Sequence, residues 1–188
     1  MQVLINDLLS FSRISTHAKR CKQVDLNEIV EGVLSDLELA VEQSNAVIEI
    51  EKLPTIEAEP FQMRQLFQNL IGNAIKFRKS GIAPHIQIGV QSMERKNSVA
   101  PPELITKITV KDNGIGFNDQ YKDKIFQIFQ RLEGRKYDGS GIGLAICKRI
   151  ISRHGGAIEA SGDIDTGATF IVTLPFKQQK QRATTKIR

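Results

Sequence analysis

The stretch GSGIGLAICKRI, residues 139–150, constrains this chain most, because three glycines at alternate positions run directly into a helix-like pattern. Glycines before a helix let backbone N–H groups converge on an anion, and the helix N-terminus adds partial positive charge. The order differs from G-x-G-x-x-G, and no G-x-x-x-x-G-K-[ST] occurs in the chain, so neither common phosphate loop is present. Taken alone, the stretch is equally compatible with a glycine-rich turn that starts a packed helix.

A second glycine motif, DNGIGF, directly follows the alternating segment ELITKITVKD, which predicts a strand over 103–112. Asp112 therefore lies at a strand end, with Gly114 and Gly116 in the loop behind it. A carboxylate there can accept a hydrogen bond from an exocyclic amine such as the 6-amino group of adenine, while the glycines let the base approach the backbone. An Asp-capped turn is the more common explanation of D-x-G-x-G by itself.

A third polar group lies in FQNLIGNAIKF, residues 67–77. Asn69 and Asn73 are four residues apart and Lys76 follows three later, so one helical face carries all three. Two side-chain carbonyls and an ammonium suit Mg²⁺ with a polyphosphate, although a solvated polar face is the alternative. Two asparagines one turn apart are not what solubility alone would select, because asparagine is a mediocre helix former.

The periodicity along the chain predicts a two-layer α/β (α+β) sandwich with mainly antiparallel strands. Asp25 with Glu28 resembles a capping box at the start of a helix that continues to Val41. Further helices are expected over 60–77 and about 142–153. Strands are expected at 47–51, within 53–60, and at 85–92, 103–112, 158–161 and 168–175.

Composition and charge limit the function classes. The chain has 188 residues, 40% of them hydrophobic, which is enough for one domain with a sizeable core. We find no apolar run of the roughly 20 residues that a membrane span needs, and no signal peptide at the start. Cys21 and Cys147 have no metal or redox spacing, which suggests reduced thiols and a cytoplasmic location. Cys147 lies in an apolar helical pattern and is most simply a core residue.

The net charge of +5 belongs to one end of the chain. Residues 177–188 hold five Lys or Arg and no acid, which leaves 21 basic and 21 acidic residues before them. We therefore expect a basic disordered tail rather than a nucleic-acid surface.

Taken together, the motifs resemble those of sensor histidine kinases, over about residues 24–176. NLIGNAIKF, DNGIGF, the paired phenylalanines of KIFQIFQRL, GSGIGLAI and GATF follow the order of the N box, first glycine box, F box, second glycine box and final small-residue turn. The segment FQRLEGRKYDGSGIGLAICKRI is similar to phytochrome-type and hybrid kinases. LINDLLSFSRI, whose apolar residues alternate at spacings of three and four, resembles the end of the second helix of a dimerisation and phosphoacceptor hairpin.

The resemblance implies a Bergerat ATP-binding fold, with a mixed, mainly antiparallel sheet covered on one face by helices. The domains would be the end of the dimerisation helix (1–16), a linker (17–24), the catalytic ATP-binding domain (25–176) and the basic tail (177–188).

It also implies a role for each matching residue, with ATP and Mg²⁺ as cofactors. Asp112 would bind adenine beside Gly114 and Gly116; Asn73, with Asn69, would hold Mg²⁺; and Lys76 would meet the phosphates, so that Asn69, Asn73 and Lys76 form the catalytic set. The phosphate cradle and final turn would comprise Gly139, Ser140, Gly141, Ile142, Gly143, Leu144 and Thr169. A lid over about 118–140 would be anchored by Phe126 and Phe129, and Arg131 and Arg135 would contact the γ-phosphate or remain solvated. Position 77 is Phe where many relatives carry Tyr or His, which keeps a packing role and removes a hydrogen bond.

The implied activity is transfer of the ATP γ-phosphate to a histidine on a dimerisation helix of a homodimeric parent, with relay to a response-regulator aspartate. In relatives the acceptor histidine is followed by Asp or Glu, and none of His17, His85 and His154 fits that pattern; His154 is better explained as a helix C-terminal cap. We therefore expect a catalytic fragment that cannot phosphorylate itself, and no nucleic-acid or membrane contact by this segment.

Two alternatives remain. One is a nucleotide-binding module or ATPase of the gyrase, mismatch-repair, heat-shock chaperone or anti-sigma kinase type, which shares this type of site without histidine phosphotransfer. The F box, the short lid, LINDLLSFSRI and Asn69, where hydrolysing relatives usually carry Glu, count against it. A degenerate regulatory domain is the other alternative, and the intact Asp112, Asn73 and second-box glycines count against it.

Overall fold

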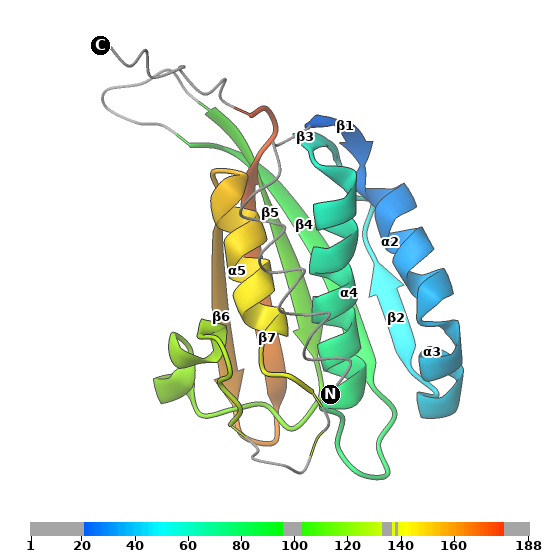
Figure 1. Cartoon of the computed structure of the whole chain (residues 1–188). Helices are drawn as coiled ribbons and strands as arrows, with labels where there is room; N and C mark the ends of the chain where they lie inside the picture. Colours follow the sequence, from blue (N-terminus) through cyan, green and yellow to red (C-terminus); the bar gives the residue numbers. More distant parts are fainter. Residues whose placement is uncertain (1–20, 96–102, 133–136, 138, 179–188) are drawn as a thin grey trace.

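A five-stranded sheet forms one layer of the computed structural model, which describes residues 21–95, 103–132, 137 and 139–178. The sheet contains β2 (Val47–Ile50), β4 (His85–Arg95), β5 (Glu103–Asp112), β7 (Gly167–Pro175) and β6 (Ala157–Asp163), in that spatial order (Figure 1). β2 pairs with β4 in parallel, and every other neighbouring pair in the sheet is antiparallel. The expected mixed, mainly antiparallel sheet is confirmed.

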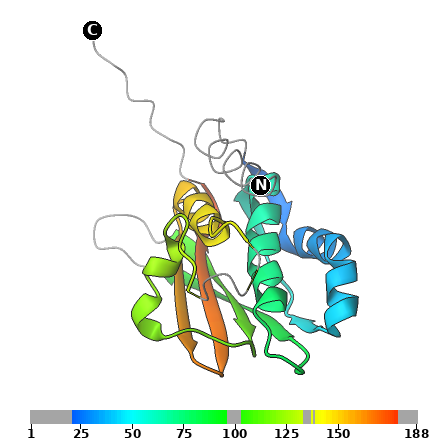
Figure 2. The ribbon, with the colours of Figure 1, turned by 60° about the horizontal axis from the view of Figure 1, so that its bottom comes forward.

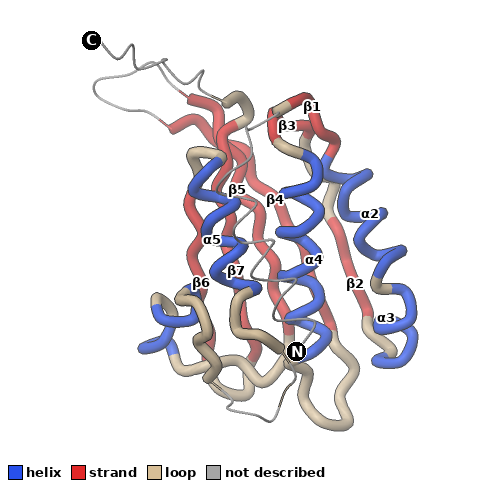
Figure 3. Tube along the Cα trace, in the orientation of Figure 1, coloured by secondary structure: helices blue, strands red, loops and turns tan. Residues whose placement is uncertain are grey.

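Helices cover one face of this sheet, as Figures 2 and 3 show. They are α2 (Leu26–Asp36), α3 (Glu38–Ser44), α4 (Pro60–Lys76) and α5 (Gly143–Arg153). Strand alternation explains the single covered face: Ile88, Ile108 and Val172 point toward the helices and are buried, whereas intervening residues such as Lys107 face the other side. The two-layer architecture is therefore a direct consequence of a period of two in the strands and an apolar stripe on each covering helix.

Helix α4 is the longest helix of the described residues, and its apolar stripe is the centre of the core. Glu59 caps its N-terminus by accepting hydrogen bonds from the backbone N–H groups of Phe61 and Gln62, and Pro60 occupies the first turn. The stripe predicted from the sequence is buried in full: Met63, Leu66, Phe67, Leu70, Ile71 and Ala74. Burial of each large side chain contributes about 1.5–3 kcal/mol, so α4 is held mainly by packing.

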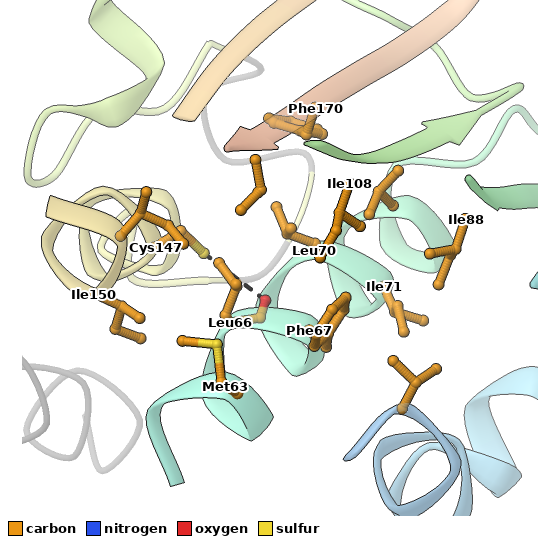
Figure 4. Close-up of a cluster of buried hydrophobic side chains, with 14 of the residues drawn as sticks. Met63, Leu66, Phe67, Leu70, Ile71, Ile88, Ile108, Cys147, Ile150 and Phe170 are labelled. Atoms are coloured by element: carbon orange, nitrogen blue, oxygen red, sulfur yellow. Dashed lines mark hydrogen bonds between the residues drawn. The ribbon is translucent and has the colours of Figure 1, made fainter. Parts of the chain in front are cut away.

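Cys147 of α5 lies in the same core, as Figure 4 shows. It is fully buried, and its Sγ lies 3.9 Å from the carbonyl oxygen of Leu66. Burial raises the pKa of the Cys147 thiol to about 12, so the group stays protonated and serves as a small apolar residue. The core role expected from the helical pattern is confirmed.

A second, two-stranded sheet differs from the expected linker at 17–24. Lys22–Asp25 form β1, which pairs antiparallel with β3 (Thr55–Ala58). Val24 is buried and lies opposite Ile56 in this pairing. The packing of this one apolar side chain joins the otherwise polar segment to the fold. Residues 17–20, the expected helix at 1–16 and most of the basic tail lie outside the described residues.

Two further local differences concern helices. The helix expected over 25–41 is divided at Leu37, whose φ of −98° and ψ of 5° end α2 and precede α3. Residues 118–132 contain only the short 3₁₀ turns η1 (Asp119–Tyr121) and η2 (Lys124–Phe126).

In the part of the chain that the structure describes, no helix combines the length and apolarity required to cross a membrane.

Candidate functional site

A cavity of about 280 Å³ opens between the C-terminal end of α4, the end of β5, the segment 118–132 and the start of α5. In Figure 1 these elements converge at the lower end of the molecule. The cavity brings together most of the residues expected from the motifs: Asn69, Asn73, Lys76, Asp112, Gly116, Arg131, Gly139, Ser140, Gly141, Gly143 and Leu144. Residues from positions 69 to 144 therefore form one site, as expected.

Asp112 lies at the end of β5 and is 8% exposed. The backbone N–H groups of Gly114 and Ala168 donate to its Oδ1, at 2.8 Å and 3.2 Å. Burial raises the pKa of this carboxyl, and the two hydrogen bonds act in the opposite direction. Because both bonds end on Oδ1, the second carboxylate oxygen remains available to accept a hydrogen bond from an amine in the cavity.

The loop behind Asp112 is held against two neighbouring segments. The Ile115 N–H donates to the carbonyl oxygen of Phe77 at 3.0 Å, which joins this loop to the end of α4. Gly116 has a φ of +64°, and a Cβ there would lie 1.9 Å from the carbonyl oxygen of Asp163, so only glycine fits. Gly114 donates its N–H to Asp112 and does not line the cavity, so its expected contact with the cofactor stays a prediction.

The polar face of α4 supplies one wall of the cavity, with Asn69, Asn73 and Lys76. The Asn69 amide oxygen is directed at the start of α5, 3.0 Å from where a Cβ of Gly143 would be. Two amide oxygens one turn apart fit Mg²⁺, which prefers oxygen ligands and usually shares them with phosphate and water. Among the described residues, no cluster of three or more His, Cys, Asp or Glu could hold a metal by itself.

The second glycine loop supplies the opposite wall. Gly139 has a φ of +148°, which favours glycine, and a Cβ at this position would lie 2.7 Å from the flexible Lys76 Nζ. The Ser140 hydroxyl oxygen accepts a hydrogen bond from the Ile142 N–H at 3.2 Å and shapes the turn into α5. Ile142 is 0% exposed, packs in the core and does not line the cavity, and its expected contact with a ligand stays a prediction.

The lid segment is attached differently from the prediction. Phe126 is buried, as expected of an anchor, but its partner is the adjacent Ile125 and not Phe129. Phe129 is 58% exposed, and its backbone has a positive φ of 64°. Arg131 lines the cavity and its guanidinium donates to the carbonyl oxygen of Tyr137. Arg135 lies outside the described residues.

Strand alternation in β7 corrects another expected contact. Ala168 and Phe170 line the cavity, whereas Thr169 points to the opposite face of the sheet. The parity of the buried residues in ATFIVTLP could have identified this from the sequence. The cavity residues that motif reasoning missed are Phe77, Ile115, Phe117, Ile125, Gln130, Leu132, Tyr137, Ala168 and Phe170. Phe77 is the last residue of the helix motif, where we expected only a packing role, and no local signal distinguishes Tyr137.

Both described histidines lie away from the cavity. His154 is the C-cap residue of α5, as predicted, and is 0% exposed. Its Nδ1 is 2.8 Å from the Ile150 carbonyl oxygen and its Nε2 accepts a hydrogen bond from the Glu59 N–H at 3.1 Å, an arrangement that requires a neutral ring. His85 lies on the uncovered face of the sheet, 2.9 Å from the Glu49 carboxylate. The Gln87 amide and then His85 lower the pKa of Glu49.

Comparisons with known proteins place this geometry among characterised folds. The family model described as histidine kinase-, DNA gyrase B- and HSP90-like ATPase matches residues 58–178. Cyanobacterial phytochrome A of Nostoc sp. (strain PCC 7120) is 42% identical over 176 residues, which cover 93% of this chain and 22% of that protein. Sensor protein kinase WalK of Staphylococcus haemolyticus is 33% identical over 179 residues, 92% of this chain and 28% of WalK.

A solved structure agrees in fold. Full-length ShkA in complex with AMPPNP superimposes with a TM-score of 0.71 at 26% identity, over 94% of this chain and 36% of ShkA. The chain thus spans less than a third of the length of the curated relatives it matches here.

Proposed function

This chain belongs to the family of histidine kinase-, DNA gyrase B- and HSP90-like ATPases, and we propose that it is the ATP-binding catalytic domain of a sensor histidine kinase. The sensor kinase and phytochrome relatives favour this function over a gyrase-type or chaperone-type ATPase. The order and spacing of the motifs support the same choice.

The buried carboxylate of Asp112 is the observation that carries the proposal. It lies at the base of the cavity with one oxygen committed to the backbone and the other available. The 6-amino group of adenine is a donor that fits such an acceptor, and the apolar residues Ile115 and Phe170 nearby suit the flat faces of a purine. A base with a carbonyl oxygen at that position would place two acceptors against each other.

The phosphates would lie between α4 and the second glycine loop. Lys76 provides a positive charge there, and the backbone N–H groups at the start of α5 provide donors at a helix N-terminus. The amide oxygens of Asn73 and Asn69 would hold Mg²⁺ together with the phosphates, and the ion would supply charge neutralisation for phosphoryl transfer. Arg131, and Arg135 beyond the described residues, are proposed as contacts of the γ-phosphate.

The phosphate acceptor is proposed to be a histidine on a dimerisation helix of a homodimeric parent, from which a response-regulator aspartate receives the phosphate. Neither described histidine suits this role. Both ring nitrogens of His154 are engaged in the core, and His85 is on the uncovered face of the sheet. In-line transfer requires an imidazole at near-attack distance from the γ-phosphate, and these two rings are held elsewhere. We place this reaction in the cytoplasm.

Replacement of Asp112 tests the nucleotide site. Asp112→Ala should weaken binding of Mg²⁺–AMPPNP about 5- to 150-fold, since a buried amine loses a partner worth roughly 1–3 kcal/mol. Isothermal titration calorimetry measures the change, and Asp123→Ala, an exposed carboxylate outside the cavity, is the matched control. Unchanged affinity in Asp112→Ala would overturn the adenine assignment.

The phosphotransfer step is tested with radiolabelled ATP and a separate hairpin that carries an acceptor histidine. Label should appear on the hairpin and not on this chain, and slowly, because a reaction tethered in the parent has become bimolecular. Acid-labile label on His17, His85 or His154 at a rate independent of the hairpin would contradict the proposal.

A further inference from the structure

Cys147 packs in the core and also lies beside Asn69, the proposed Mg²⁺ ligand, where α5 meets α4. Its thiol donates to the carbonyl oxygen of Leu66 at 3.9 Å (Figure 4), and Leu66 is three residues before Asn69 in α4. Helical side chains lean toward the N-terminus of their helix, so the Asn69 side chain lies back over the turn that carries this carbonyl. The thiol and the Asn69 amide therefore meet between the two helices, and they are hydrogen-bonded to each other.

The Asn69 amide extends along α5 with its oxygen toward the cavity. Its Oδ1 lies 3.0 Å from the place that a Cβ at Gly143 would take. Gly143 lines the cavity, whereas Cys147, about one helical turn further along α5, is 0% exposed. The oxygen is thus at the cavity end of the amide, and the nitrogen is at the core end.

The hydrogen bonds of the thiol agree with this orientation. Burial raises the pKa of Cys147 to about 12, while its own backbone N–H and then the Asn69 side chain act in the opposite direction. A neighbour that lowers this pKa by a hydrogen bond must donate to the sulfur, because only a donor stabilises the thiolate. The Asn69 Nδ2 is therefore the atom that faces Cys147, and the S–H is directed at Leu66.

We propose that Cys147 is a positioning residue that fixes the Asn69 amide with its oxygen toward Mg²⁺. This inference rests on the proposed function. The terminal torsion of an asparagine is broad, so an amide keeps one orientation only where its oxygen and nitrogen have different partners. Turned by half a rotation, the amide would present N–H groups to the cation, and Mg²⁺ requires oxygen ligands.

Removal of the thiol should reduce the effect of Mg²⁺ on nucleotide binding. The quantity to measure on the 188-residue chain is the Mg²⁺ enhancement, the ratio of AMPPNP affinity with Mg²⁺ to that with EDTA, by isothermal titration calorimetry. Cys147→Ala should lower this ratio about 2- to 5-fold and change adenosine affinity less than about 2-fold. Cys147→Ser, which keeps a donor and an acceptor, should retain the wild-type ratio.

Two controls separate positioning from packing. Ile150→Val removes one carbon from the same buried face of α5, outside the cavity, and should leave the Mg²⁺ enhancement unchanged while it lowers the melting temperature. In an Asn69→Ala background, Cys147→Ala should cause no further loss, because the amide that the thiol orients is gone. Thermal melting checks that each variant is folded, and Cys147→Val, an apolar residue of similar size, replaces Cys147→Ala if the latter does not fold.

Three results would overturn the role of Cys147: an unchanged Mg²⁺ enhancement in Cys147→Ala, an equal loss in Cys147→Ser, or an undiminished effect in the Asn69→Ala background. A wild-type chain whose AMPPNP affinity does not depend on Mg²⁺ would also overturn it and would leave the adenine site standing. A wild-type chain that binds neither adenosine nor Mg²⁺–AMPPNP would instead overturn the proposed function and this inference with it.

Discussion

The cavity has two walls that are built in different ways. On the wall formed by α4 and the end of β5, Asp112 accepts hydrogen bonds from two backbone N–H groups, and the apolar stripe of α4 is buried. On the lid side, the described residues 118–132 bury Ile125 and Phe126 and pack the partly buried Tyr121 and Leu132 against the core. Ile128 and Phe129 are 42% and 58% exposed. From this difference we propose that nucleotide recognition resides on the packed wall, and we expect the described lid residues 118–132 to have low local stability.

Removal of a core side chain beneath the packed wall should have the largest effect. Leu70 of α4 is 1% exposed in the cluster of Figure 4, so Leu70→Ala should lower the free energy of unfolding by ~2–5 kcal/mol. Urea denaturation measures it, with Leu39→Ala, at a 66% exposed site of α3, as the control. Equal effects at the two sites would remove the distinction between core and surface in this layer.

A pair of lid substitutions should sharpen the comparison. Phe126→Ala should lower the free energy of local opening of residues 118–132 by about 2 kcal/mol, less than the loss expected for a phenylalanine in a continuous core. Phe129→Ala should change this free energy by less than about 0.5 kcal/mol. Hydrogen exchange with mass spectrometry measures both. A larger effect of Phe129→Ala would restore the anchor role that its exposure argues against.

Acidification should act on the packed wall through Asp112, whose pKa is raised above the usual 3.8 by burial. As an acceptor for adenine the group must be ionised, so nucleotide affinity should fall about tenfold per pH unit below that raised pKa. For the free chain the sign is opposite: the raised pKa contributes stability in acid, and this is lost as pH rises through the folded pKa.

Fluorescence titrations with a labelled ATP analogue over a pH series measure this fall of nucleotide affinity in acid. Asp112→Asn, which has no proton to gain there, should bind more weakly with a flat profile. If Asp112→Asn still lost affinity at low pH, a titrating group other than Asp112 would be responsible.

The smallest expected effect is a gain of stability in the packed wall. Gly72 lies inside α4 beside Asn73, and a Cβ there meets nothing within 4 Å. Gly72→Ala should therefore raise the free energy of unfolding by about 0.5–1 kcal/mol, because alanine loses less backbone entropy in a helix. Chemical denaturation checks the sign, and destabilisation would mean that this surface is more crowded than its geometry indicates.

The sequence by itself determined the elements and the chemistry that depend on near neighbours. The stripe of α4, the polar face with Asn69, Asn73 and Lys76, and the carboxylate of Asp112 at a strand end follow from helical and strand periods, and all four polar residues line the cavity. Position in a period is decided within a few residues, which is why these predictions hold.

Only the tertiary structure decided which neighbours these residues meet. Asp112 is fixed by Ala168, 56 residues away, and His154 joins the end of α5 to Glu59 across 95 residues. Phe129 was expected as an anchor because the motif contains it. Whether such a side chain is buried depends on the backbone conformation and on distant residues, which the motif does not show. Contacts of this kind form only when separate elements pack together. The local sequence around a residue therefore does not show which distant residue it will contact.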